Sequence, residues 1–258
     1  MLKRSRAIAP ALLVALLLLP AANALAAPQY VALGDSYSAG VGSRVFYEET
    51  CFRSPDAYPP LIASARGYAL SFEACSGATT KEVNEKQLGP LSSSTSLVTI
   101  TIGGNDAGFS EVMLSCALYY FTCQESIEEA DYFIRYSLPG LLNTTYSDIR
   151  ARAGNARVVV LGYPHLFTSS GTTCNFNLLT SEHEKELNST ANILDQVISE
   201  RAAAHGFTFV DPRKDFEAHE VCSSSEWLNG QSWPLRESYH PNQAGYRVFQ
   251  SLIEAALP

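Results

Sequence analysis

The chain has 258 residues, and its 26 acidic and 18 basic side chains give a formal net charge of −8 at pH 7. This excess of negative charge argues that the chain does not bind nucleic acid or anionic lipid by electrostatic attraction. No repeat, low-complexity tract or linker divides residues 28–258, whose length fits one domain of ordinary α/β size.

The start of the chain has the pattern of a secretory signal peptide. Three basic residues lie within the first six positions, residues 11–19 are almost wholly apolar, and residues 24–26 read Ala-Leu-Ala. The apolar run is shorter than the ~20 residues of a membrane-spanning helix. We expect cleavage after Ala26, a secreted domain of residues 27–258 with a formal charge of −11, and no stable membrane insertion.

All six cysteines lie in this domain: Cys51, Cys75, Cys116, Cys123, Cys174 and Cys222. An even count in an exported chain predicts disulfides, and six cysteines allow 15 pairings. Zinc is the alternative, but the chain has no Cys-x-x-Cys. The sequence therefore predicts disulfides and no metal, and leaves the pairing open.

Strand and helix patterns alternate along the domain. Short β-prone runs predict strands over 30–33, 69–74, 97–102, 157–161 and 207–210. Helical patterns cover 56–65, 109–117, 126–153, 180–204 and 243–256, and Pro139-Gly140 could break the third. The alternation predicts an α/β fold, three-layered and flavodoxin-like, with a parallel sheet of about five strands and helices on both faces.

Three of these strands end in polar loops that contain glycine. The loops are Gly34-Asp35-Ser36, Ser76-Gly77 and Gly104-Asn105. Because parallel strands place their carboxyl ends at one edge of the sheet, the loops can converge on a single cleft.

Ser36 follows the first predicted strand at the point where Gly34 permits a sharp turn. A serine at such a corner exposes its hydroxyl at the ligand-binding edge of the sheet. Asp35 or Ser36 could instead simply cap a following helix. This stretch alone therefore leaves two interpretations, a helix cap and a nucleophile.

A serine hydroxyl needs a base to become nucleophilic, and His240 is the best candidate. It lies in a turn-rich stretch before the last helix, and Pro241 biases it away from helical geometry. His165, at the end of the fourth strand, is the competing histidine, and a structural role for His240 also remains open.

An ester carbonyl under attack develops negative charge on oxygen, which fixed hydrogen-bond donors stabilise. Gly77 can present its N–H without a side chain, and Asn105 can aim its amide at the same point. Each residue taken alone could instead have no catalytic role and simply form a turn.

Taken together, the four blocks resemble the SGNH hydrolases, also called GDSL lipases and esterases. They are Gly34-Asp35-Ser36, Gly77, Gly103-Gly104-Asn105-Asp106 and His240, in the family's order and across the whole domain. The resemblance implies Ser36 as nucleophile and His240 as base, with oxyanion donors from the Ser36 N–H, the Gly77 N–H and the Asn105 amide. It implies no cofactor. The Gly-x-Ser-x-Gly of common α/β-hydrolases is absent.

The third catalytic member departs from the family pattern. Many members carry Asp three residues before the histidine, where this chain has Glu237. Other secreted members orient the histidine with a backbone carbonyl, which here means Ser238 or Glu237. Either group could fix the tautomer of the imidazole. We favour the Ser238 carbonyl, with the Glu237 side chain as the alternative.

The stretch 30–42 and the six cysteines look most like the secreted bacterial lipase branch of the family. That resemblance implies hydrolysis of fatty-acyl esters, including triacylglycerols, by a monomer that binds small-molecule or lipid esters. The alternatives are a phospholipase, a carbohydrate acetylesterase and a non-catalytic binding protein. Apolar residues that could flank an acyl chain are Phe46, Tyr47, Phe109, Leu118, Tyr119, Tyr120 and Phe121.

The resemblance also supports sequential disulfides. These would be Cys51–Cys75, Cys116–Cys123 and Cys174–Cys222. The first would tie the loop after Ser36 to the strand end that leads to Gly77.

Overall fold

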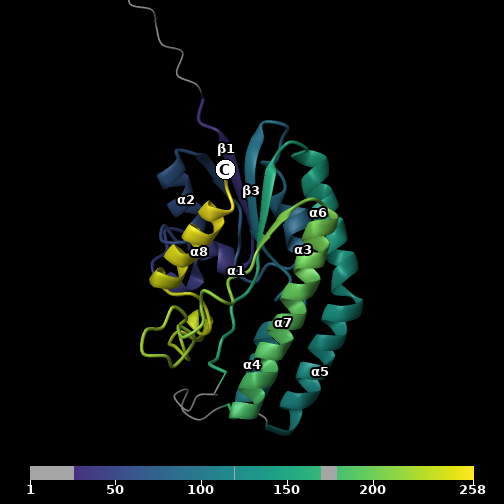
Figure 1. Ribbon diagram of the computed structural model, residues 1–258, viewed down its shortest axis with the longest axis vertical. Helices are drawn as coiled ribbons and strands as arrows, with labels where there is room; N and C mark the ends of the chain where they lie inside the picture. Colours follow the sequence, from purple (N-terminus) through teal and green to yellow (C-terminus); the bar gives the residue numbers. More distant parts are fainter. Residues whose placement is uncertain (1–25, 119, 170–178) are drawn as a thin grey trace, which may run out of the picture.

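The centre of the protein is a five-stranded parallel sheet (Figure 1). In this computed structural model, residues 26–118, 120–169 and 179–258 are described. The strand order β2-β1-β3-β4-β5 is the flavodoxin-like order and confirms the predicted fold class. The strands are β1 (Gln29–Gly34), β2 (Ala69–Phe72), β3 (Thr95–Thr101), β4 (Arg157–Leu161) and β5 (Thr208–Val210).

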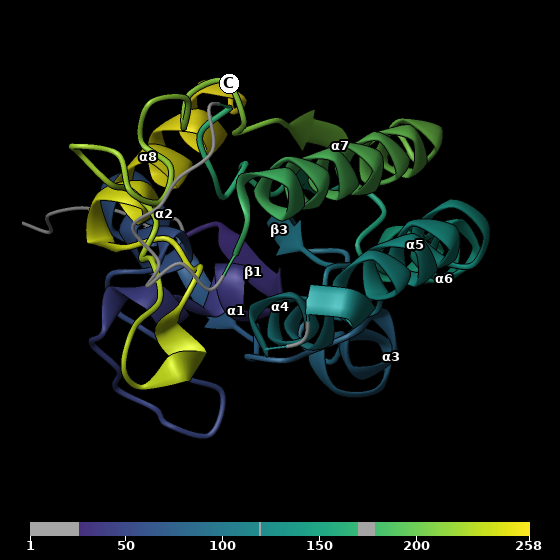
Figure 2. The same ribbon diagram turned by 90° about the horizontal axis from the view of Figure 1, so that it is seen from below.

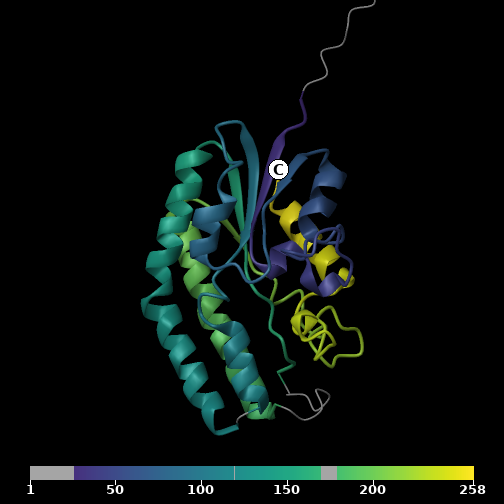
Figure 3. The same cartoon turned by 180° about the vertical axis from the view of Figure 1, so that it is seen from behind.

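The central strands are buried on both faces, which explains their continuous apolar runs. In β1, Tyr30 and Leu33 have no exposed surface, and Leu33 pairs in register with Ile100 of β3. Helices α2 (Tyr58–Arg66) and α8 (Gln243–Ala255) cover one face. The opposite side carries α4 (Phe109–Leu118), α5 (Tyr120–Tyr136), α6 (Leu138–Arg152) and α7 (Ser181–Ala204), as Figures 2 and 3 show.

The long helix expected over 126–153 is two helices. The chain turns at Ser137, and Pro139 lies in the first turn of α6, where its missing N–H removes no helical hydrogen bond. The break that the sequence suggested at Pro139-Gly140 is therefore close to the observed boundary between α5 and α6. Helix α5 also begins at Tyr120, six residues before the expected start.

Short helical segments follow the first two strands, and the sequence indicated only the first of them, as a helix that Asp35 or Ser36 could cap. Helix α1 (Ser36–Ala39) follows β1, and α3 (Thr80–Glu82) continues into the π-helical turn η2 (Val83–Gln87). A capping box in which Thr79 and Glu82 bond each other's backbone starts α3. The Thr-x-x-Glu pattern in the sequence was a usable signal for it.

Two disulfides cross-link the described residues, as the resemblance implied. One joins Cys51 to Cys75, and the other joins Cys116 of α4 to Cys123 of α5. Cys174 lies outside the described residues, so the pair Cys174–Cys222 stays a prediction. Within the ranges given above, no helix combines the length and the apolar character that crossing a membrane requires.

Candidate active site

Ser36 is the first residue of α1, directly beyond the sharp turn that ends β1. Gly34 has a φ of 118°, and a Cβ there would lie 2.4 Å from the Thr101 carbonyl oxygen, so only glycine fits. Asp35 is the N-cap of α1, and its carboxylate accepts the Tyr37 N–H at 2.9 Å. Because Asp35 makes the cap, the Ser36 hydroxyl is left free of that role.

The Ser36 hydroxyl contacts His240, which lies 204 positions later in the chain. Ser36 Oγ is 2.8 Å from His240 Nε2, and His240 Nδ1 is 2.9 Å from the Ser238 carbonyl oxygen. A carbonyl can only accept, so Nδ1 carries the proton, and Nε2 is left to accept from the serine hydroxyl. This tautomer is the one that a general base requires.

Tyr239 shapes the backbone between the Ser238 carbonyl and the imidazole. Its φ of 60° lies in the left-handed region, an unusual conformation for a residue with a side chain. Its carbonyl accepts the Tyr37 hydroxyl at 2.6 Å, and its N–H donates to the Asn229 carbonyl at 2.9 Å. Two buried hydrogen bonds therefore hold the turn in this conformation.

Burial lowers the pKa of His240 to about 4, although the hydrogen bond to Ser238 opposes part of this shift. The imidazole is therefore neutral at pH 7, with its base nitrogen available.

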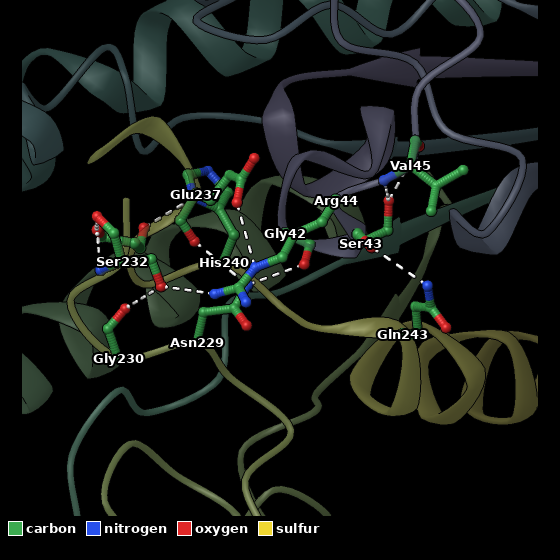
Figure 4. Close-up of polar contacts among 11 residues, drawn as sticks. Gly42, Ser43, Arg44, Val45, Asn229, Gly230, Ser232, Glu237, His240 and Gln243 are labelled. Carbon is green, nitrogen blue, oxygen red and sulfur yellow. Dashed lines mark hydrogen bonds and ion pairs between the residues drawn. The ribbon is translucent and has the colours of Figure 1, made fainter. Parts of the chain in front are cut away.

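The partner of the Glu237 carboxylate is Arg44. The carboxylate is buried and forms an ion pair with Arg44, whose Nε is 3.2 Å from Oε2 (Figure 4). The hydrogen bond of His240 Nδ1 goes instead to the Ser238 carbonyl. This geometry favours the Ser238 carbonyl as the group that orients His240.

Asn229 is a polar anchor of the histidine loop that the sequence did not reveal. Its side-chain amide donates to the Gly42 carbonyl at 2.8 Å and to the Glu237 carbonyl at 3.3 Å (Figure 4). Its backbone N–H donates to the His240 carbonyl. In a single sequence, Asn229-Gly230 is indistinguishable from a turn signal.

The three expected oxyanion donors line the same cavity as the Ser36 hydroxyl. Gly77 has a φ of 80°, and the Ser36 N–H belongs to the first turn of α1, where backbone donors lack helical partners. The Asn105 amide donates to the Ala78 carbonyl at 3.0 Å. One hydrogen bond fixes the orientation of the amide and leaves its second N–H for a ligand.

Tyr163 links the nucleophile turn to the loop that carries Asn105. Its hydroxyl donates to the Asp35 carboxylate and accepts the Gly104 N–H at 3.1 Å. Burial raises the pKa of Asp35 to about 7. In the sequence, Tyr163 is recognisable only as a residue after the end of a strand, and nothing there indicates this contact.

A cavity of about 190 Å³ extends from Ser36 and His240 between the helices. Its apolar lining comes mainly from α4, α5 and α7: Phe109, Val112, Ala130, Ile134, Leu187 and Leu194. Of the residues expected beside an acyl chain, Phe109 lines it. The expectation was wrong for Phe46, which packs on Phe52, and for Tyr47, which is exposed. The side chains of residues 118–121 lie outside the described part.

His165, the competing candidate for the base, forms its hydrogen bond with Asn192 and not with Ser36. Its Nε2 is 2.8 Å from Asn192 Oδ1, and it lines a separate polar hollow with Arg213. Across the described residues, no three His, Cys, Asp or Glu side chains are grouped to hold a metal ion.

Comparison with known proteins gives the family. The model of the GDSL-like lipase/acylhydrolase family matches residues 32–248. The chain is 47% identical over 230 residues to Lipase 1 of Streptomyces coelicolor, covering 87% of this chain and 85% of that protein. These matches show that the chain belongs to the GDSL-like lipase/acylhydrolase family and is a carboxylic ester hydrolase.

Two solved structures agree with this assignment. The crystal structure of phospholipase A1 from Streptomyces albidoflavus has a TM-score of 0.85 and 45% identity, covering 89% of this chain and 99% of that one. The extracellular lipase from Streptomyces rimosus has a TM-score of 0.85 and 41% identity, covering 89% and 100%.

The Glu237→Gln substitution tests which group orients His240. We expect kcat for a p-nitrophenyl ester to fall by less than about tenfold, or ~1.4 kcal/mol, because Nδ1 bonds a backbone carbonyl. Losing a true triad carboxylate costs on the order of 10⁴ in kcat. Ser238→Ala, which keeps the carbonyl, is the matched control and should stay near wild type. A thousandfold loss in Glu237→Gln with an active control would mean that the chain uses a Ser-His-Glu triad.

The pKa of His240 predicts an acid-tolerant enzyme. A base with a pKa of about 4 stays neutral as the pH falls through 6.5, the usual value for histidine. We therefore expect kcat/KM for p-nitrophenyl acetate to stay level between about pH 7 and pH 5.5, and to fall only as the pH approaches the lowered pKa. A fall centred near pH 6.5 would contradict an imidazole that stays neutral at that pH.

Proposed function

We propose that this protein is a secreted lipase that cleaves fatty-acyl esters, including triacylglycerols, through an acyl-enzyme on Ser36. The observation that carries the proposal is the 2.8 Å contact between Ser36 Oγ and His240 Nε2 at one end of an apolar cavity. Membership of the family supports ester hydrolysis, and a relative with 47% identity is named Lipase 1.

The acylation step uses groups that already lie in place. Ser36 Oγ attacks the ester carbonyl carbon while His240 Nε2 takes its proton. The Ser238 carbonyl, on the far side of the ring, stabilises the imidazolium that forms. The carbonyl oxygen becomes an oxyanion and accepts from the Ser36 N–H, the Gly77 N–H and the Asn105 amide, each donor being worth on the order of 10²–10³ in kcat.

Collapse of this intermediate breaks the bond to the alcohol, which leaves with the proton from His240. His240 then takes a proton from water, and the hydroxide attacks the acyl carbon on Ser36. Collapse of the second intermediate returns the proton to Ser36 Oγ and releases the fatty acid.

The cavity gives a physical reason to prefer long acyl chains. Its lining is mostly apolar, and each methylene taken out of water contributes about 0.8 kcal/mol. An acetyl group would use little of this surface. A chain lying against Val112, Ile134 and Leu187 would use much more of it.

A phospholipase activity is the second candidate, on one specific observation. The exposed Arg236 lines the cavity together with Ser36 and His240, and a guanidinium there could pair with a phosphate. The structural relative from Streptomyces albidoflavus carries the name phospholipase A1.

Secretion is part of the proposal. Residues 1–26 have the pattern of a signal peptide, the two disulfides suit an oxidising compartment, and the Streptomyces rimosus relative is described as extracellular. We expect the secreted domain to be a monomer.

A panel of p-nitrophenyl esters from acetate to palmitate tests the proposal, with emulsified triacylglycerol and phosphatidylcholine alongside. We expect turnover of the long-chain esters and of triacylglycerol, and no turnover by Ser36→Ala. Ser76→Ala removes another serine hydroxyl from the same cavity and should keep activity. Substantial turnover by Ser36→Ala would contradict the assignment of Ser36 as nucleophile. Activity confined to the acetate ester would favour an acetylesterase.

A further inference from the structure

Large apolar side chains are exposed on two loops that are far apart in the sequence. Trp233 is 86% exposed and Leu235 is 56% exposed, and on the other loop Tyr47 is 60% exposed and Val45 is 43% exposed. We call these four residues the rim patch. Single exposed apolar residues are normal on a protein surface, whereas several of them gathered beside a site mark an interaction surface.

Contacts between residues next to these four hold the two loops of the rim patch together. Arg44, next to Val45, donates from Nη2 to Ser232 Oγ at 2.9 Å and forms the ion pair with Glu237 (Figure 4). Arg236, next to Leu235, places its guanidinium 4.5 Å from the centre of the Phe52 ring. These contacts bracket Trp233 and Leu235 and hold their loop against the loop of Val45 and Tyr47.

The rim patch borders the cavity in which the ester reacts. Leu235 and Arg236 belong to one short helical turn, η3 (Leu235–Glu237), and Arg236 lines the cavity with Ser36 and His240. A surface in contact with Leu235 therefore lies beside the reacting groups.

The charges around the rim patch favour a surface without net charge. Arg44 and Arg236 are exposed near it, but Glu49 is exposed on the same loop as Tyr47, and the secreted domain carries a formal charge of −11. Cations beside acids give no general attraction to an anionic surface. Tryptophan, in contrast, prefers the interface between headgroups and acyl chains because its ring is apolar and its N–H is polar.

We propose that the rim patch docks the enzyme on a zwitterionic lipid surface, with Trp233 and Leu235 entering the interface. This inference rests on the proposed function, because a substrate of low solubility is presented at such a surface. Docking would place the cavity over the lipid, so that an ester passes into it without crossing water.

Vesicle binding tests the docking directly. All chains carry Ser36→Ala so that the vesicles of phosphatidylcholine stay intact. We expect the parent chain to float with the vesicles, and Trp233→Ala with Leu235→Ala to lower the partition coefficient at least tenfold. The matched control is Tyr132→Ala with Tyr136→Ala, which removes two aromatic rings of similar exposure from α5.

A second measurement follows the Trp233 side chain itself. Brominated phosphatidylcholine quenches tryptophans that enter the interface, and Trp233 is far more exposed than the chain's other tryptophan, Trp227. We expect quenching in the Ser36→Ala chain and its loss in Trp233→Ala. Absence of vesicle binding or of quenching in the parent chain would overturn the proposal, as would equal losses in the rim and control variants.

Kinetics of chains that keep Ser36 separate docking from catalysis. The rim variant should hydrolyse monomeric p-nitrophenyl acetate at the wild-type rate and emulsified tributyrin at least tenfold more slowly. Equal slowing on both substrates would assign the rim patch to catalysis or folding and would contradict docking. If the wild type binds vesicles but cleaves no long-chain ester, docking stands and the proposed lipase function fails.

Discussion

The site depends on one backbone constraint, the left-handed turn at Gly34. The turn lets the Asp35 N–H bond the Thr101 carbonyl at the end of β3, while the Gln87 side-chain amide bonds both the N–H and the carbonyl of Gly34. A side chain at Gly34 would collide with β3, so the turn and the neighbouring strand fit only together. Ser36 is thereby fixed beside the loop that follows β3 and carries Asn105.

The histidine reaches this point from the far end of the chain, and buried polar contacts fix its position. The Asn229 amide donates to the carbonyls of Gly42 and Glu237. The Tyr37 hydroxyl donates to the Tyr239 carbonyl, and the buried Glu237 carboxylate is paired with Arg44. An unpaired buried carboxylate would be costly, so the ion pair stabilises the loop that presents His240. Glu237 thus supports the histidine loop while the Ser238 carbonyl bonds the ring itself.

The sheet could be predicted from the sequence, and the proposed reacting groups could be singled out in it, because both depend on local signals. Glycine turns after β-branched runs mark the strand ends, and four motif blocks mark Ser36, Gly77, Asn105 and His240. The cavity could not be predicted in the same way, since Val112, Ile134 and Leu187 look like ordinary core residues until α4, α5 and α7 pack together. The Glu237–Arg44 pair was hidden because it joins positions 193 apart, and charge alone does not say which partner a carboxylate meets.

Reaction with a p-nitrophenyl phosphonate, whose phosphorus stands in for the ester carbonyl, tests the Ser36–His240 pair through the site and rate of labelling. We predict one adduct per chain, on the peptide that contains Ser36. The adduct should be lost in His240→Ala, where the base is missing, and kept in Glu237→Gln, where the Ser238 carbonyl still orients the ring. An adduct on another residue, or phosphonylation of His240→Ala at the wild-type rate, would contradict the Ser36–His240 pair as the reacting unit.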